Sequence, residues 1–534
     1  MLRRLHRAAV VAATVGVLAC PGGRRGPPPE RFVPADVAAA VVLPETAQAV
    51  KELAALAATL ARFPGGGEIA TTRGALAAQL GFDPLDPKAL AEAGIEPRRG
   101  AAVAWPRGAG RGLTRTPIVI LPVDDAGRLE ALFVRLARDR LGATERAATR
   151  RGEASVVTLR VPGSGAPALS YALVERTAIL CAGPGGADAV ATAAAVRPEA
   201  SLGEAAAWKA ARRALEDGVS AIAWAPPGSP LLDGVWPLAD GLAVGLSAAH
   251  DRLLARAAVL LGDREPSFRA LSAGGAAAAA VARLDPRAQL VARWDGDFAA
   301  LGAKVLPMLP AAERSLLASA GIDPARDLFG ALAPGGAVSV SLAPALDLTA
   351  LSSRAVRSDP LRAVEVEAIL PLKDPAATDE ISTRVAALAA HARRPARPPD
   401  GVFRVRTTSG EIAWRVDARG KRLVLAGGRP GRLADLEARL AHGEGWRPPT
   451  EAAGAALRGG LGGAVLDPVR LVEAVRAMPD EAFGTGPSGF VMRSLVERFV
   501  DPASRLSALS LRADLAEGAL VLALEVEARA GRTP

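Results

Sequence analysis

The chain has 534 residues, with 65 Lys and Arg, 56 Asp and Glu, and a formal charge of +9. This length predicts more than one domain, and a chain that is half hydrophobic can bury a sizeable core without disulfides. Two cysteines and four histidines exclude a disulfide framework and any multi-cysteine zinc or iron–sulfur site. Basic and acidic residues are interspersed and aromatic residues make up 4% of the chain, so we expect no nucleic-acid partner.

The N-terminus has the pattern of an export signal. Met1–Arg7 is short and basic, and Ala8–Leu18 is an apolar run that is too short to span a membrane. The run ends in Val17-Leu18-Ala19-Cys20, which resembles a bacterial lipobox, the signal that directs acylation of its cysteine and cleavage before it. We therefore expect a signal peptide over residues 1–19, lipidation at Cys20 and a Gly/Pro/Arg-rich tether over residues 20–30. An ordinary cleaved signal peptide is the alternative.

The elements that follow are helices interspersed with runs of strands. Thr46–Arg62 has apolar residues at helical spacing, and Asp124 or Asp125 caps a helix that ends near Leu141. The segment 170–182 predicts an antiparallel hairpin, and the segment 241–261 predicts a longer one that turns near His250. Runs of strands without strict alternation with helices favour an α+β fold over a doubly wound parallel sheet.

Features of this first half recur in the same order in the second half, at offsets from 227 (Ala93 to Ala320) to 249 (Pro122 to Pro371). They comprise a helix end with its turn, a small-residue strand, an apolar strand with a following helix, a strand pair and a closing hairpin. We infer an internal duplication. The predicted organisation is a first module over residues 31–265, an Ala-rich linker over residues 266–284 and a second module over residues 285–530. Each module is expected to be a mostly antiparallel sheet with packed helices.

Aspartate followed by proline recurs as a helix-start signal, because the carboxylate can cap the helix and proline suits its first turn. Asp374-Pro375 precedes the helix of the second module that matches the one after Asp125. The other pairs are Asp83-Pro84, Asp86-Pro87, Asp323-Pro324 and Asp467-Pro468.

The candidate chemical sites mostly have structural explanations. The Gly-rich turns 183–186 and 427–431 each follow a strand and open a helix, but they lack the Lys-Ser/Thr of a phosphate loop, so we interpret them as turns that need positive φ. The histidines form no metal-binding spacing, and no Gly-x-Ser-x-Gly elbow marks a nucleophile. Cys181 is expected to be a buried, inert thiol. The seven isolated tryptophans are expected to be core or rim anchors, although a few could line a cleft. We predict no catalytic, cofactor-binding or metal-binding residue.

Three features carry a resemblance to a family of uncharacterised bacterial envelope proteins, often lipoproteins, made of duplicated α+β modules. One is the opening pattern over residues 32–41, another is the helix start at Ser201–Glu204 leading to Trp208, and the third is the closing hairpin of each half. The resemblance implies an architecture and a location in the cell envelope, and it implies no reaction.

These observations predict an exported, non-enzymatic protein that the acyl chains on Cys20 anchor to the inner or outer membrane, with its modules in the periplasm or at the cell surface. The favoured role is a binding or scaffolding component that meets an envelope protein through its sheets. The alternative is a carrier of a lipid or other apolar ligand held between sheet and helices, which a cavity of several hundred Å³ would favour. A periplasmic hydrolase is the less favoured third possibility.

Overall fold

The computed structural model describes residues 26–61, 67–107, 116–215, 218–232, 239–249, 251–271, 277–308, 311–319, 321–344, 346, 359–390, 396–484 and 486–529. The predicted α+β class is confirmed at the level of its elements, since helices and strands are mixed and the strand pairings described below are all antiparallel. The chain divides into two compact units. The first contains the described residues up to Asp263 together with Ala516–Val521, and the second contains the other described residues.

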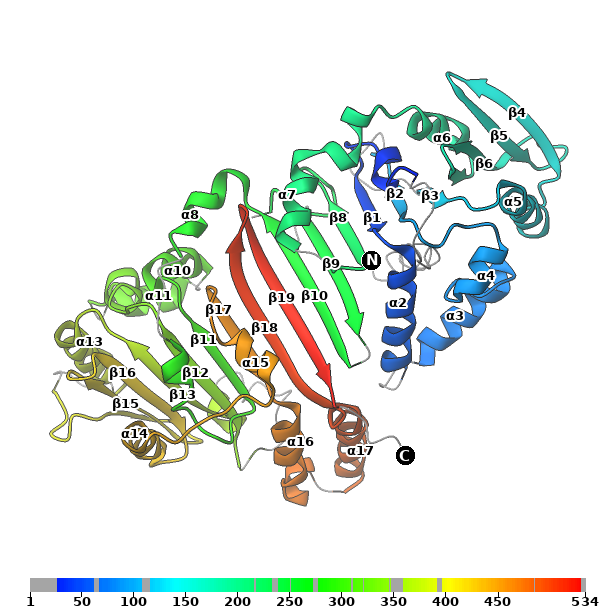
Figure 1. The fold of residues 1–534 in the computed structure, drawn as a ribbon. Coiled ribbons are helices and arrows are strands. Elements are labelled where there is room, and N and C mark those ends of the chain that lie inside the picture. The colour runs from blue at the N-terminus through cyan, green and yellow to red at the C-terminus, as the bar shows by residue number, and fades with distance from the viewer. Residues whose placement is uncertain are drawn as a thin grey trace. The chain divides into compact units, whose positions relative to one another are not determined.

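The first unit places its helices around one antiparallel sheet (Figure 1). Its strands are β1 (Ala39–Leu43), β2 (Ala101–Trp105), β3 (Ile118–Pro122), β4 (Glu145–Arg151), β5 (Ala154–Arg160), β6 (Pro167–Val174), β7 (Thr177–Ala182), β8 (Ala221–Ala225), β9 (Gly241–Ala249) and β10 (Arg252–Leu260). They pair in the order β4-β5-β6-β7-β3-β2-β1-β8-β9-β10. Its α-helices are α2 (Thr46–Leu60), α3 (Gly67–Leu80), α4 (Pro87–Glu92), α5 (Ala126–Leu141), α6 (Gly186–Ala194) and α7 (Ala206–Leu215). Short 3-10 helices are η1 (Pro29–Phe32), η2 (Pro198–Ala200), η3 (Leu202–Glu204) and η4 (Gly262–Arg264), the last of which ends on the first residue of the second unit.

The strands of the second unit also pair antiparallel. Its strands are β11 (Leu290–Trp294), β12 (Gly336–Leu342), β13 (Val364–Pro371), β14 (Phe403–Arg406), β15 (Glu411–Asp417), β16 (Arg422–Gly428), β17 (Gly462–Leu466) and β18 (Leu506–Ala516). They pair in the order β14-β15-β16-β13-β12-β11-β17-β18. The last strand, β19 (Ala519–Ala528), begins in the first unit and passes into the second after Val521.

The helices of the second unit follow the same mixed pattern. They are α8 (Glu265–Arg269), α9 (Ala277–Val281), α10 (Phe298–Val305), α11 (Ala311–Ser319), α13 (Pro375–Ala389), α14 (Arg432–His442), α15 (Glu451–Ala456), α16 (Pro468–Arg476) and α17 (Gly486–Ala503). Shorter pieces are η5 (Leu306–Met308), the π-helical η6 (Pro324–Phe329), η8 (Pro360–Arg362) and η9 (Asp480–Phe483). In the stretch 266–284, Val281 and Leu284 lie in the core of this unit.

Aspartate caps start several of these helices. Asp125 accepts a hydrogen bond from the Arg128 amide at α5, and Asp374 accepts two at α13, with Pro375 in its first turn. Asp86, Asp323 and Asp467 do the same for α4, η6 and α16. Asp83 was predicted to be a cap, and this is wrong. Its carboxylate accepts from the Leu85 amide and from Arg73, because the chain makes a turn there and the next helix begins only at Pro87.

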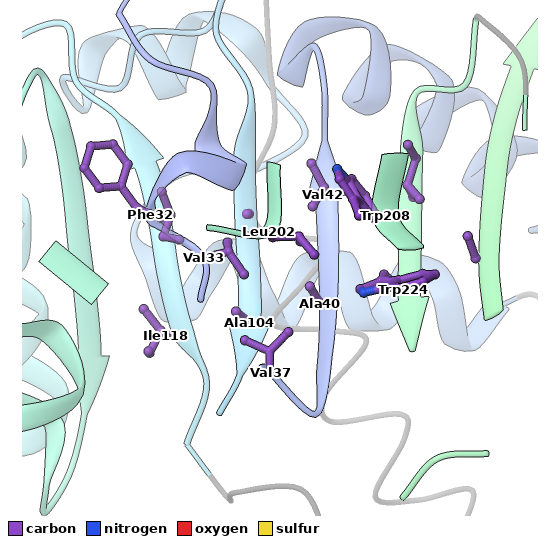
Figure 2. Close-up of a cluster of buried hydrophobic side chains, with 14 of the residues drawn as sticks. Phe32, Val33, Val37, Ala40, Val42, Ala104, Ile118, Leu202, Trp208 and Trp224 are labelled. Atoms are coloured by element: carbon purple, nitrogen blue, oxygen red, sulfur yellow. The ribbon is translucent and has the colours of Figure 1, made fainter. Parts of the chain in front are cut away.

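The sheet of the first unit is packed on both faces. Figure 2 shows one of the two cores, which extends across the strands from Phe32 and Ile118 past Leu202 to Trp208 and Trp224. The other face of the same strands lies under α5, whose Leu129, Leu132 and Phe133 fill the second core. Alternation along β3 separates the two faces, since Ile118 and Ile120 join the first core whereas Leu121 joins the second. Strands β2, β3, β5, β6 and β7 therefore have side chains of the unit packed on both of their faces.

Candidate functional site

The second unit has a cavity of about 550 Å³ on the α13 face of its sheet. Helix α13 contacts strands β14 and β15 and the helix η6, and it lies along this face of the sheet (Figure 1). The sheet contributes to the cavity wall Leu370 of β13, Val405 of β14, Ile412 and Trp414 of β15, and Leu423 and Leu425 of β16. The cavity is therefore held between a sheet and helices, and its volume is in the usual range for a small-molecule site.

Strand alternation and register explain why these side chains meet. Leu370 is opposite Leu423 in the β13–β16 ladder, and Trp414 is opposite Leu425 in the β15–β16 ladder. Residues two apart on a strand share a face, so Leu423 and Leu425 both face α13. The Trp414 ring also stacks on Phe403, with 5.6 Å between ring centroids, which fixes its position in the wall. Trp414 is thus one of the tryptophans that line a cleft.

Helix α13 leaves the space open because two of its inward positions carry small side chains. When α5 and α13 are aligned at their capping residues, Asp125 and Asp374, Leu129 corresponds to Thr378 and Phe133 corresponds to Ser382. Leu129 and Phe133 are buried and fill the core of the first unit. Thr378 and Ser382 are also buried, but they line the cavity.

On the sheet, in contrast, both units carry a large aromatic side chain at the corresponding position. Tyr171 of β6 and Trp414 of β15 occupy matching places in the two hairpins, Tyr171 opposite Leu180 and Trp414 opposite Leu425. The Tyr171 ring packs on Phe133 with 5.2 Å between centroids, and its hydroxyl donates to Glu130. Burial raises the pKa of Tyr171 to about 12, so the hydroxyl stays a donor. In the second unit, α13 carries Ser382 where α5 carries Phe133, so the helix offers no matching ring to pack against Trp414.

Two of the polar groups at the cavity wall, Thr378 and Asp327, already have partners. The Thr378 hydroxyl donates to the Asp374 carbonyl, 2.8 Å away, within the first turn of α13. The buried Asp327 accepts from Arg326 at 2.6 Å and from the Asp323 amide. The hydrogen bond from Arg326 lowers the pKa of Asp327 and outweighs its burial, so this carboxylate stays ionised and paired. The cavity therefore offers an apolar molecule a hydrocarbon wall.

The opposite face of the same sheet holds a buried ionic cluster under α14. Arg432 donates to Glu365 at 2.6 Å and to Asp285 at 2.7 Å, and Arg439 donates to Glu367 at 2.6 Å. All three carboxylates are buried, and Glu367 is fully so. The cluster borders a hollow of about 950 Å³, but its charged groups are paired with one another. We therefore interpret the cluster as the means by which α14 is attached to the sheet.

The pKa shifts in this cluster follow from burial and pairing. Burial acts to raise the pKa of Asp285, but hydrogen bonds from the Arg287 amide and from Arg432 outweigh it and lower the pKa. Burial raises the pKa of Glu367, against the opposing charges of Arg432 and Arg439. Burial acts to lower the pKa of Arg432, and the surrounding carboxylates reverse this and raise it.

Apart from Trp414, the cysteine and histidines singled out from the sequence that the structure describes do not line the cavity. Cys20, with the signal peptide, lies outside the described residues, as do His250 and His391. His442 is exposed at the end of α14. Cys181 is buried in the core of the first unit, as predicted, and burial raises the pKa of its thiol. Among the described residues no group of three or more His, Cys, Asp or Glu could hold a metal ion.

The glycine-rich turns have the geometry predicted for them. Gly185 and Gly431 are the N-terminal caps of α6 and α14, with φ of 79° and 88°. A residue with a β-carbon would be strained in this left-handed conformation. The recurrence of glycine at both positions therefore has a backbone cause.

Comparisons with known proteins give limited information. No protein-family model and no curated protein matches the sequence. Among solved structures, crystal form IV of TP0453 aligns at a TM-score of 0.24 with 6% identity, over 45% of this chain and 83% of that chain. Crystal form I of TP0453 aligns at 0.24 with 8% identity, over 44% and 79% of the two chains. At such TM-scores the function has to be inferred from the residues of this chain. Of the helices in its described part, none combines the length and apolarity that crossing a membrane requires.

Proposed function

We propose that the second unit binds the hydrocarbon part of an apolar ligand, such as a fatty acyl chain, in the cavity under α13. The observation that carries the proposal is the wall itself, in which leucines of β13 and β16 and apolar residues of α13 line about 550 Å³ together with Trp414. Of the roles expected from the sequence, this favours the carrier of an apolar ligand over the scaffold. The proposal includes no catalytic step.

The chemistry of the wall defines the ligand class. Transfer of a methylene group from water to such a wall is favourable by about 0.8 kcal/mol. A polar group of the ligand that was buried in this wall without a hydrogen-bond partner would make binding less favourable. Thr378 and Asp327 cannot serve as partners because they are already paired. A ligand with one apolar chain and a solvated polar head meets both conditions, because only the chain enters the cavity.

We further propose that the two units arose by duplication and that the second was adapted for binding. Two matching strand orders support this: β7-β3-β2-β1-β8-β9 in the first unit and β16-β13-β12-β11-β17-β18 in the second. The matching caps of α5 and α13 support it as well. In this account the first unit kept a filled core, and the second exchanged leucine and phenylalanine for Thr378 and Ser382.

The location remains a proposal from the sequence. A lipid anchor on Cys20 in the cell envelope would hold a carrier of apolar molecules next to the membrane that supplies them. Labelled palmitate should enter the wild-type protein and should be lost in Cys20→Ala. Incorporation that survives this substitution would contradict the anchor and would leave the cavity proposal untouched.

Titration with a fluorescent fatty acid tests the binding proposal. We expect cis-parinaric acid to bind the full chain saturably, with energy transfer from tryptophan, and oleate to displace it. Trp414→Phe should reduce the energy transfer and retain most of the affinity, and Trp105→Phe in the first unit is the matched control. Binding that is not saturable, or energy transfer unchanged by Trp414→Phe, would contradict the proposal.

A further inference from the structure

Helix α17 of the second unit exposes an apolar stripe to solvent. Phe490, Val491, Leu495 and Phe499 are 74%, 66%, 48% and 60% exposed, and they are the most concentrated group of exposed large hydrophobic residues in the described chain. Val491, Leu495 and Phe499 are four residues apart, so they follow one side of the helix. We call these four residues the α17 stripe.

The stripe is additional to the contact that holds the helix in place. Val496 and Val500 face α16 and η9, where Phe483 and Met478 meet them around a small hollow. Arg493 lies over the Phe483 ring, 4.8 Å from its centroid, and pairs with Asp480. The apolar arc of α17 is thus wider than its packing against the unit requires. An apolar patch of this kind on a protein surface marks an interaction site.

The size of the stripe argues against a second copy of the chain as the partner. With about 200 Å² for a phenylalanine and somewhat less for valine and leucine, the exposed fractions give roughly 450 Å² for one copy. Two copies would bury about 900 Å² in total through the stripe, less than the roughly 1,200 Å² at which specific, stable interfaces begin. A lipid surface needs no matching partner surface, since the acyl region solvates any apolar side chain.

The charges on α17 decide between lying on a membrane and crossing it. Arg493, Glu497, Arg498 and Asp501 are spread over the 18 residues of the helix, too many for a spanning segment. Glu497 and Arg498 are exposed. Two positive and two negative side chains cancel, so attraction to anionic headgroups contributes little. From these features we infer that α17 lies in the surface of a lipid bilayer, with the α17 stripe among the acyl chains.

The inference does not rest on the cavity under α13, and it adds a second contact with lipid. If the anchor at Cys20 is present, the bilayer is always within reach. A surface-bound α17 would then hold the second unit at the membrane from which an apolar ligand leaves.

A fluorophore on α17 tests the inference without interference from the N-terminus. In the full chain carrying Cys20→Ala, Phe499→Cys is labelled with an environment-sensitive dye, and Glu497→Cys, about 160° away around the helix, is the matched control. Cys181 is buried and stays unlabelled in the folded protein. With phosphatidylcholine vesicles we expect a blue shift of the dye at position 499 and no shift at position 497, at low and at high salt.

Each other result overturns the inference. No shift at position 499, or equal shifts at both positions, would show that the stripe does not enter the bilayer. A shift that depends on protein concentration without vesicles would indicate a second copy. A shift that disappears at high salt would indicate binding through charge. As a second measurement, Phe490→Ser with Phe499→Ser should weaken vesicle partitioning at least about tenfold, whereas Leu511→Ser with Leu524→Ser, also exposed, should not.

Discussion

Replacing Ser382 by the residue found at the matching position of the first unit should close the cavity. A phenyl ring adds on the order of 100 Å³, and cavity volume costs about 24 cal/mol per Å³, so filling it sets an upper limit of roughly 2 kcal/mol of stabilisation. Imperfect fit reduces this gain, and we expect Ser382→Phe to stabilise the ligand-free protein by about 1 kcal/mol. The same ring displaces about three methylene groups of a bound chain, which should weaken fatty-acid binding roughly 60-fold.

Chemical denaturation and titration with cis-parinaric acid measure the two effects on the same samples. Ser382→Ala is the control, because it removes the hydroxyl and leaves the volume open, and it should bind with nearly wild-type affinity. If Ser382→Phe destabilises the protein by more than about 1 kcal/mol while fatty-acid binding is unchanged, Ser382 does not border a ligand site and the reasoning is refuted.

Two further predictions concern the matched core and the ionic cluster. Phe133→Ala should lower the free energy of unfolding by about 3–5 kcal/mol, because Phe133 is buried in a filled core; a loss below 1 kcal/mol would contradict that packing. Asp285→Asn should destabilise the protein by about 3 kcal/mol at pH 7, where it leaves Arg432 without one of its carboxylates. The folded pKa of Asp285 is lowered, so its contribution is fully present above its unfolded pKa, near 3.9, and is lost as the pH falls below that value. In denaturation experiments, the difference in the free energy of unfolding between wild type and Asp285→Asn should therefore be smaller at pH 3 than at pH 7. A larger difference at pH 3 would contradict the lowered pKa of Asp285.

The sequence was informative where the signal is local. Asp125 and Asp374 start helices because a capping carboxylate acts within three residues, and Gly185 and Gly431 mark turns because only glycine adopts their φ without strain. The hairpin β6–β7 was predicted from two apolar runs in close succession. Its turn residues, Glu175 and Arg176, have positive φ without being glycine, and composition gave no sign of this.

The sequence was less informative where the cause is tertiary. Glu365 and Glu367 alternate with valine, a pattern typical of a half-exposed strand, yet both are buried because Arg432 and Arg439 on α14 cover them. The cavity exists because side chains around it are too small to fill the space, and no local sequence pattern signals unfilled volume. Comparing the two caps could have revealed it, since the alignment places Ser382 where the first unit has Phe133.

Photo-crosslinking with a diazirine fatty acid tests most directly whether the second unit holds an apolar chain under α13. The full chain is irradiated with the probe, digested and mapped by mass spectrometry, with and without excess oleate. We predict oleate-sensitive crosslinks on α13 and on β15 and β16, near Ile381, Val385, Trp414 and Leu423. Crosslinks confined to the first unit or to α17, or labelling on α13 that excess oleate does not reduce, would contradict the account.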